Sequence, residues 1–349
     1  MKRHLRIGTR DSELAMWQAT LVQDLLNKNG ISSELVYIKS EGDIDTVTPL
    51  YQLGVQGVFT RSLDAALLSK RIDIVVHSMK DVPTQLAQGI QQAAVLKRGS
   101  HKDIFVAHPE APFRLPPVGE ATNTQPSVFG ETNTNKGSAI IEALQCGEAL
   151  PSGGLGWAIA TSSIRRIAQW LYRYPGHRIE NLRGNVNTRL QKLKESNWNG
   201  AIFAAAGLER INLRPGNSIE LDWMLPAPAQ GAIMVVCRAN DPFACEACHQ
   251  FNDPISALCT KIERDFLSRL MGGCSTPISA LAVMSYAQII FKGNICAPDG
   301  SKKIEIEQVA NISEANDLGI AVAEKIVLNG GQEIVDSIRK TGLTTDAEA

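Results

Sequence analysis

The chain has 349 residues, 44% of them hydrophobic and 20% charged, and its formal net charge at pH 7 is −1. This length exceeds what one ordinary hydrophobic core accommodates, so two or three domains are expected. The balanced charge excludes a generally basic nucleic-acid-binding protein, and an anionic ligand would have to be recognised by locally gathered arginines.

The N-terminus and the cysteines indicate the compartment. Residues 1–8 carry the charges of a signal peptide without the apolar segment that should follow, and no stretch reaches the length of a membrane span. We therefore expect a cytoplasmic protein without membrane contact. The chain has 7 cysteines, an odd number. In a reducing compartment they are thiols, and no disulfide framework is implied.

The first 102 residues alternate strand-like and helical patterns. The predicted elements are a strand at 5–10, a helix at 13–28, a strand at 34–39, a polar lid-like segment at 40–57, a helix at 59–69 and a β-branched strand at 72–76. This alternation predicts an α/β domain with a parallel sheet, in which ligands bind at the carboxyl ends of the strands. Arg10 and Ser12 follow one such end, and residues 77–83 follow another.

A Pro-, Asn- and Thr-rich stretch at 108–154 interrupts the alternation, and we interpret it as a surface insertion with at most one helix, at 138–146. A second α/β domain follows. Its elements are strands at 157–161 and 201–205, a helix at 162–171 and a helix up to residue 193. A hinge-like proline pair at 226 and 228 then leads back toward the first domain, to which a strand at 232–237 belongs. Serines open the helix at 162–171 and two arginines lie in its first turn, which favours anion binding.

The remaining residues predict a small α+β domain. A helix ends near residue 270, strand-like runs follow at 278–285, 287–292 and 304–309, and helices follow near 313–328 and 331–340. We therefore assign residues 1–102 and 230–250 to a first domain, 103–226 to a second domain with the insertion, and 253–349 to a third.

A cysteine loop, Gly272-Gly273-Cys274 closed by Pro277, leaves the helix that ends near residue 270. Glycines allow a ligand to approach the backbone closely, and the proline stiffens the exit of the loop. Most free cysteines are small buried hydrophobic residues. In this setting we interpret Cys274 as an attachment point.

Six short blocks follow one another along the chain: residues 6–12 (RIGTRDS), 77–83 (HSMKDVP), 160–166 (ATSSIRR), 182–186 (LRGNV), 205–208 (AAGL) and 272–274 (GGC). In this order they resemble the porphobilinogen deaminase family, also called hydroxymethylbilane synthases. Each block alone is a weak signal, but six in the family's order are hard to obtain by chance.

The resemblance implies a transferase that joins four porphobilinogens head to tail into hydroxymethylbilane, releasing ammonia at each addition, in tetrapyrrole and haem biosynthesis. The fold class is then α/β, with two hinged, doubly wound domains resembling the lobes of periplasmic binding proteins. A small α+β C-terminal domain carries the cofactor cysteine. The implied cofactor is a dipyrromethane, built from the substrate and attached covalently through Cys274.

The resemblance also implies the site residues. Each pyrrole carries an acetate and a propionate, which planar guanidinium groups bind well. The implied cofactor-binding residues are Cys274, Lys80, Asp81, Thr161, Ser163, Arg165, Arg166 and Arg189, and the implied substrate-binding residues are Arg10, Ser12, Arg183 and Arg189. Asp81 is the implied catalytic carboxylate, stabilising the positive charge left when ammonia departs.

The partner expected is the small molecule porphobilinogen, bound by a monomer without nucleic acid, membrane, metal or dissociable cofactor. Residues 245–249 (CEACH) formally match the c-type haem attachment motif, but such attachment requires export. Cys237 and Cys259 do not provide the second pair of ligands that a zinc site needs.

Two alternatives stay open, a hinged two-domain anion-binding protein and an inactive homologue without turnover. The first needs neither a cysteine loop nor a carboxylate among cations, and the retained motif residues argue against the second. Two features depart from the family: Gln56 stands in the lid where a lysine is usual, and the insertion is longer than expected. Arg264, which follows Glu263, is interpreted as part of an intra-domain ion pair.

Overall fold

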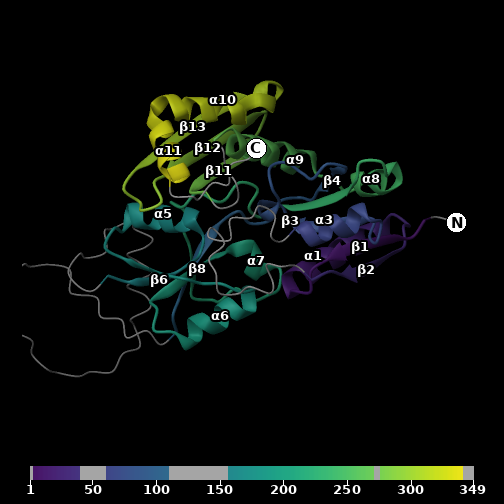
Figure 1. Ribbon diagram of the computed structural model, residues 1–349, viewed down its shortest axis with the longest axis horizontal. Coiled ribbons are helices and arrows are strands. Elements are labelled where there is room, and N and C mark those ends of the chain that lie inside the picture. Colours follow the sequence, from purple (N-terminus) through teal and green to yellow (C-terminus); the bar gives the residue numbers. More distant parts are fainter. Residues whose placement is uncertain (1–2, 40–59, 110–155, 271–275, 341–349) are drawn as a thin grey trace, which may run out of the picture.

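The computed structural model describes residues 3–39, 60–109, 156–270 and 276–340. The predicted lid with Gln56, the helix predicted at 138–146 and Cys274 lie outside the described residues. Two α/β lobes lie beneath a smaller C-terminal domain (Figure 1). Within the described ranges, no helix combines the length and the apolar character needed to cross a membrane.

The first lobe is built on a five-stranded sheet in the order β2-β1-β3-β10-β4. These strands are β1 (Leu5–Thr9), β2 (Ser33–Tyr37), β3 (Ile74–Ser78), β4 (Ile90–Val95) and β10 (Ile233–Arg238), of which β10 runs antiparallel to its neighbours. Helices α1 (Glu13–Lys28) and α8 (Pro242–His249) pack on one face, and α3 (Arg61–Leu68) packs on the other. Ser12 begins α1 by accepting a hydrogen bond from Ala15 N, which satisfies a free amide of the first turn.

The second lobe repeats this plan in the strand order β7-β6-β8-β5-β9. Its strands are β5 (Asp103–Ala107), β6 (Ala158–Ala160), β7 (Arg178–Glu180), β8 (Gly200–Ala204) and β9 (Ser218–Glu220). Helix α5 (Ile164–Arg173) covers one face, where Trp170 stacks on Phe105 with ring centroids 5.8 Å apart. Helices α6 (Val186–Glu195) and α7 (Ala205–Glu209) cover the other face.

The C-terminal domain has an antiparallel sheet of β11 (Ile278–Ser285), β12 (Gln288–Cys296) and β13 (Lys303–Asn311). Helices α9 (Pro254–Arg269), α10 (Leu318–Ile326) and α11 (Gln332–Lys340) share its hydrophobic core. Phe266 of α9 packs against Phe291 with ring centroids 5.1 Å apart. The prediction of two α/β lobes and a small α+β domain is confirmed, whereas β4, β5 and β9 were not predicted.

The chain crosses between the lobes twice, after β4 and before β10, and the two crossing segments are bonded to each other. Gly99 N donates to Gly231 O at 3.0 Å. Glu263 of α9, which is fully buried, binds both segments, accepting from Arg98 Nη1 at 2.5 Å and from Ala229 N at 2.6 Å. The C-terminal domain therefore holds the hinge region from outside the two lobes.

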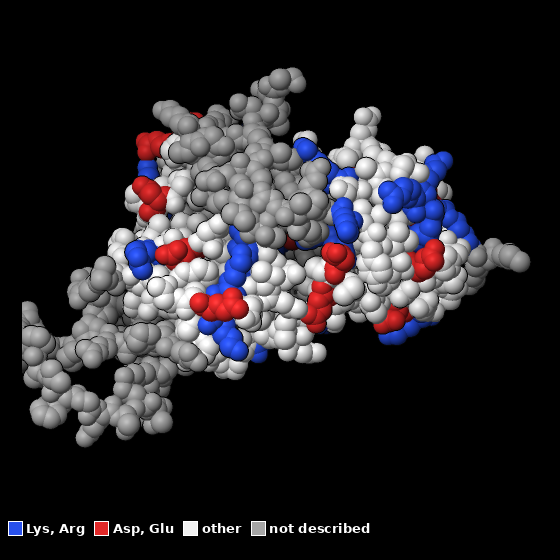
Figure 2. Space-filling model, turned by 60° about the horizontal axis from the view of Figure 1, so that its bottom comes forward, with Lys and Arg blue, Asp and Glu red and all other residues white. Residues whose placement is uncertain are grey.

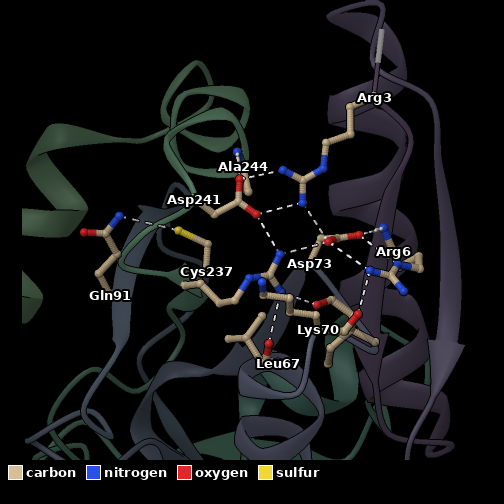
Figure 3. Close-up of polar contacts among 11 residues, drawn as sticks. Arg3, Arg6, Leu67, Lys70, Asp73, Gln91, Cys237, Asp241 and Ala244 are labelled. Carbon is tan, nitrogen blue, oxygen red and sulfur yellow. Dashed lines mark hydrogen bonds and ion pairs between the residues drawn. The ribbon is translucent and has the colours of Figure 1, made fainter. Parts of the chain in front are cut away.

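An ion-pair network fastens the N-terminus to the first lobe, at the edge where β3 begins (Figure 3). Asp73 accepts hydrogen bonds from Arg6 Nε at 2.9 Å, Arg3 Nη2 at 2.8 Å and Arg238 Nη2 at 3.0 Å. Asp241 accepts from Arg3 Nη1 and Arg238 Nη2, each at 2.7 Å. Burial alone would raise the pKa of Asp73, but the hydrogen bonds from these arginines outweigh it and hold the pKa below its ordinary value.

We expect Asp73→Asn to lower the melting temperature at pH 7 and to matter less in acid. Because the pKa of Asp73 is lower in the folded state, its stabilisation is complete above the unfolded pKa of about 4 and is lost as the pH falls through the folded value. Melting curves from pH 7 down to about pH 3 should therefore show a constant gap between parent and variant above about pH 4 and the start of convergence below it. Glu307→Gln, which removes the exposed pair with Lys292, is the control, and a gap that stays constant across the series would contradict the expectation.

Candidate active site

The predicted site residues follow the carboxyl ends of parallel strands in both lobes. In the first lobe β1 and β3 end at the same edge, since Gly8 is paired with Val75. In the second lobe β6 and β8 end together, since Ala160 is paired with Ala201. Ligands bind at this edge of open α/β sheets. The residues that follow these strands are Arg10 and Ser12 after β1, Lys80 and Asp81 after β3, and Thr161 and Ser163 after β6.

Charged residues that follow the strands of one lobe act on charged residues of the other lobe. Arg189 lies on α6, and its pKa is lowered to about 10 by burial and by the positive charges of Arg166, Arg183 and Arg10. The carboxylate of Asp81 opposes this shift. Arg10 and Asp81 belong to the first lobe and the other arginines to the second, so the predicted residues form one electrostatic unit.

The ammonium group of Lys80 is likewise disfavoured by its surroundings. Its pKa is lowered to about 8, mainly by burial and also by the charges of Arg166 and Arg165, while the charges of Asp81 and Asp103 oppose this shift. The ammonium Nζ lies 3.4 Å from Gln230 Oε1, a long hydrogen bond. A cation that its surroundings disfavour in this way binds an added carboxylate well, because the carboxylate restores the missing counter-charge.

A fully buried carboxylate, Asp103 at the start of β5, holds the two arginines of α5. Arg165 Nη1 lies 2.7 Å from Oδ2, and Arg166 Nη2 donates to Oδ1 at 2.7 Å. Gln230 Nε2, from the second crossing segment, donates to Oδ1 at 3.0 Å. Burial alone would raise the pKa of Asp103, but the two arginines outweigh it and hold the pKa well below its ordinary value.

The second lobe offers further donors to an anion. Arg165 Nε is buried and has no hydrogen-bond partner among the described residues. Ser163 occupies the N-cap position of α5 but, contrary to the prediction that serines cap this helix, its side chain makes no capping hydrogen bond. Ser162 instead accepts from Leu182 N at 2.8 Å. An unpaired buried guanidinium nitrogen beside an uncapped helix start fits a ligand that carries carboxylates.

The remaining predicted residues differ in their burial and in their hydrogen bonds. Thr161 is buried, and its Oγ1 accepts from Ser163 N at 3.3 Å, while the Ser12 hydroxyl caps α1. Arg183 is also buried, in the segment between β7 and α6. Cys274 lies outside the described residues, between the end of α9 and the start of β11.

The gathering of cations is local. Both signs of charge occur across the described part of the face in Figure 2, as the net charge of −1 requires. The site arginines therefore do not belong to a generally basic surface. Sequence reasoning missed Asp103 and Gln230, and the signal for Asp103 was a single acidic residue that opens the apolar run 104–106.

A family model described as "Porphobilinogen deaminase, dipyromethane cofactor binding domain" matches residues 5–246, and one described as "Porphobilinogen deaminase, C-terminal domain" matches residues 257–327. The chain belongs to the porphobilinogen deaminase family. The predicted family is thus confirmed, and so is the predicted dipyrromethane cofactor of this family of transferases. The buried arginines described above fit the carboxylates of such a group.

Relatives named porphobilinogen deaminase match almost end to end. That of Pelotomaculum thermopropionicum is 36% identical over 97% of this chain and 98% of its own, and that of Geobacter sulfurreducens is 34% identical over 99% and 98%. An arginine-specific periplasmic binding protein of Salmonella typhimurium aligns with 73% of this chain and 94% of its own at a TM-score of 0.34 and 10% identity. The fold assignment therefore rests on the strand order within each lobe.

Proposed function

We propose that the chain condenses four porphobilinogens head to tail into hydroxymethylbilane, releasing ammonia at each addition, with Asp81 as its catalytic carboxylate. Membership of the porphobilinogen deaminase family places this transferase in tetrapyrrole biosynthesis. The observation that supports the residue assignment is the position of Asp81, whose negative charge acts on Lys80, Arg166 and Arg189 from both lobes.

We propose that Cys274 carries the dipyrromethane and that Lys80, Asp81, Thr161, Ser163, Arg165, Arg166 and Arg189 surround it. When bound, the dipyrromethane supplies the pyrrole to which the first substrate is joined and anchors the product until its release. The chain's own part is electrostatic. Buried guanidinium groups hold carboxylates in fixed directions, and Asp103 orients two of those groups.

Arg10, Ser12, Arg183 and Arg189 are proposed to bind the acetate and propionate of the incoming porphobilinogen. Departure of ammonia leaves positive charge on the substrate, which the Asp81 carboxylate would stabilise from a fixed position. The same carboxylate can accept a proton in the later steps. A site with many cations, and with a carboxylate that accepts no hydrogen bond from the described residues, thus serves an anionic substrate that becomes locally cationic during reaction.

The proposal also covers the compartment, the oligomeric state and the domain bounds of the enzyme. We propose a cytoplasmic monomer without a nucleic-acid partner. The net charge of −1 and the mixed surface charges support the last of these points. The proposed domains remain 1–102 with 230–250, 103–226, and 253–349, supported by the grouping of the strands into three sheets. A binding protein is not favoured, because family membership extends over both matched domains. An inactive homologue is not favoured either, because the chain retains Arg10, Asp81, Arg165, Arg166 and Cys274 together.

Intact-mass measurement of the denatured protein tests the attachment. We expect the parent to carry the extra mass of two linked pyrroles and Cys274→Ser to carry none, because only a thioether would survive denaturation. Cys259→Ser is the matched control, since that thiol is buried and burial raises its pKa to about 11. A parent that stays unmodified after incubation with porphobilinogen, or a modified Cys274→Ser variant, would rule out this attachment.

A further inference from the structure

Arg264 joins the C-terminal domain to the segment that carries Asp81. It lies on α9, one residue after the glutamate that holds the crossing segments. Its guanidinium donates hydrogen bonds to four backbone carbonyls of the first lobe, those of Met79 (3.4 Å), Val82 (2.9 Å), Pro83 (2.5 Å) and Thr84 (3.2 Å). An arginine expected in an intra-domain ion pair thus bridges two domains.

The segment that receives these bonds has little regular structure of its own. Met79–Asp81 form one turn of 3-10 helix, η2, in which Val82 N donates to Met79 O at 3.2 Å. Such short turns are weakly held by their own hydrogen bonds, and Pro83 has no N–H to add another. A guanidinium presents five N–H donors in a rigid plane, so one side chain can fix several carbonyls at once.

The charged side chains of the segment act in the direction of the second lobe. Lys80 Nζ reaches Gln230 Oε1, and the carboxylate of Asp81 acts on Arg166 and Arg189. The segment is therefore held through its backbone by α9, while the charge of Asp81 acts on two arginines of the site. Any shift of the backbone would move the carboxylate relative to those arginines.

We propose that Arg264 is a positioning residue for Asp81, a role that rests on the proposed function of Asp81 itself. It fixes the backbone of residues 79–84 from the C-terminal domain and so sets where the carboxylate stands. Helix α9 runs for about 7.5 Å beyond Arg264, at 1.5 Å per residue, and ends at Arg269. Helix α9 thus contacts both crossing segments and the segment that carries Asp81.

The test compares Arg264→Gln with Arg269→Gln, an exposed arginine of the same helix that pairs with Glu324. A misplacement of about 1 Å can cost about 100-fold in rate. For Arg264→Gln we therefore expect a kcat at least about tenfold lower per molecule of loaded enzyme, with KM changed less than about threefold, because other arginines bind the substrate. The Arg269→Gln variant should match the parent in both constants.

Hydrogen exchange supplies a readout that does not depend on activity. In Arg264→Gln the amides of residues 79–84 should exchange at least about tenfold faster, while those of β3 stay protected, since the strand is bonded on both sides. Uniformly faster exchange throughout the first lobe would instead indicate general destabilisation and would overturn the positioning role. Unchanged exchange in 79–84 would overturn it too.

Two further variants keep the result decisive if Arg264→Gln folds poorly. In Arg264→Ala, added guanidinium chloride at millimolar concentration should recover at least about threefold in kcat, and sodium chloride at equal ionic strength should not. The double variant Arg264→Gln with Asp81→Asn should be no slower than Asp81→Asn, because the arginine acts through that carboxylate. Losses that multiply would overturn the inference, whereas near-normal turnover of Asp81→Asn alone would overturn the proposed function.

Discussion

Asp81→Asn should give a folded enzyme that turns over at least about 100-fold more slowly than the parent per molecule of loaded enzyme. The asparagine keeps the shape of the side chain and removes the charge. Since the proposed role is to stabilise positive charge on the substrate, the loss should fall on kcat more than on KM. Initial rates of product formation, normalised to the cofactor content found by intact mass, measure it.

The fold should tolerate this change. The Asp81 carboxylate accepts no hydrogen bond from a described residue, and its side chain is half-buried, so we expect a loss of less than about 1 kcal/mol in the free energy of unfolding. Asp317→Asn, an exposed carboxylate of the C-terminal domain, controls for the charge change. A rate for Asp81→Asn within about threefold of the control would refute the catalytic assignment.

Local patterns in the sequence predicted much of the fold, because the spacing of apolar residues and the β-branched runs themselves favour a helix or a strand. Helix α1 has the predicted bounds of 13–28, and Ala19, Val22 and Leu26 belong to its buried face. Strand β3 was predicted from its β-branched run. The blocks at 6–12, 77–83 and 160–166 lie at the carboxyl ends of β1, β3 and β6, and their residues Arg10, Asp81 and Arg166 all act on the charge of Arg189.

Contacts between distant residues could not be predicted in the same way. Asp103 and Arg166 are 63 positions apart, and Arg98 and Glu263 are 165 positions apart. Nothing in either local pattern specifies such a partner, because the ion pair exists only once the lobes and the C-terminal domain have packed. Strand β9 is only 3 residues long, too short for a periodic pattern to develop.

Arg264 illustrates a further limit. An arginine next to a glutamate on a helix suggests a local ion pair, but the two side chains project from the helix in different directions. Glu263 reaches the crossing segments and Arg264 reaches residues 79–84. The backbone carbonyls that Arg264 binds have no signature in the sequence, so their role emerges only from the packing of α9 on the first lobe.

Asp103→Asn should be the most destabilising of the changes considered, costing about 3–5 kcal/mol in the free energy of unfolding. The variant keeps the volume of the side chain but leaves Arg165 and Arg166 buried without a counter-charge. Its amide nitrogen would also replace one of the oxygens that now accept hydrogen bonds. Urea denaturation followed by circular dichroism gives the difference. Asp222→Asn, which breaks the exposed pair with Lys102, should cost less than about 1 kcal/mol.

The double variant with Arg166→Gln separates the ion pair from general damage. If the cost comes from an unpaired buried cation, removing that cation should recover about 1–3 kcal/mol relative to the sum of the single changes. Additive losses would mean that Asp103 acts through packing alone. The pair is fully buried, so high salt should change this coupling little, in contrast to the coupling between Lys102 and Asp222.

The penalty of Asp103→Asn should also depend on the cofactor. In the parent background, carboxylates of the bound dipyrromethane can supply part of the missing negative charge to Arg165 and Arg166. In the Cys274→Ser background they cannot, so the same substitution should cost at least about 1 kcal/mol more there. An equal penalty in both backgrounds would mean that the two arginines do not hold the cofactor. A purely structural ion pair would give that equal penalty. The comparison therefore shows whether Arg165 and Arg166 only stabilise the fold or also bind the cofactor.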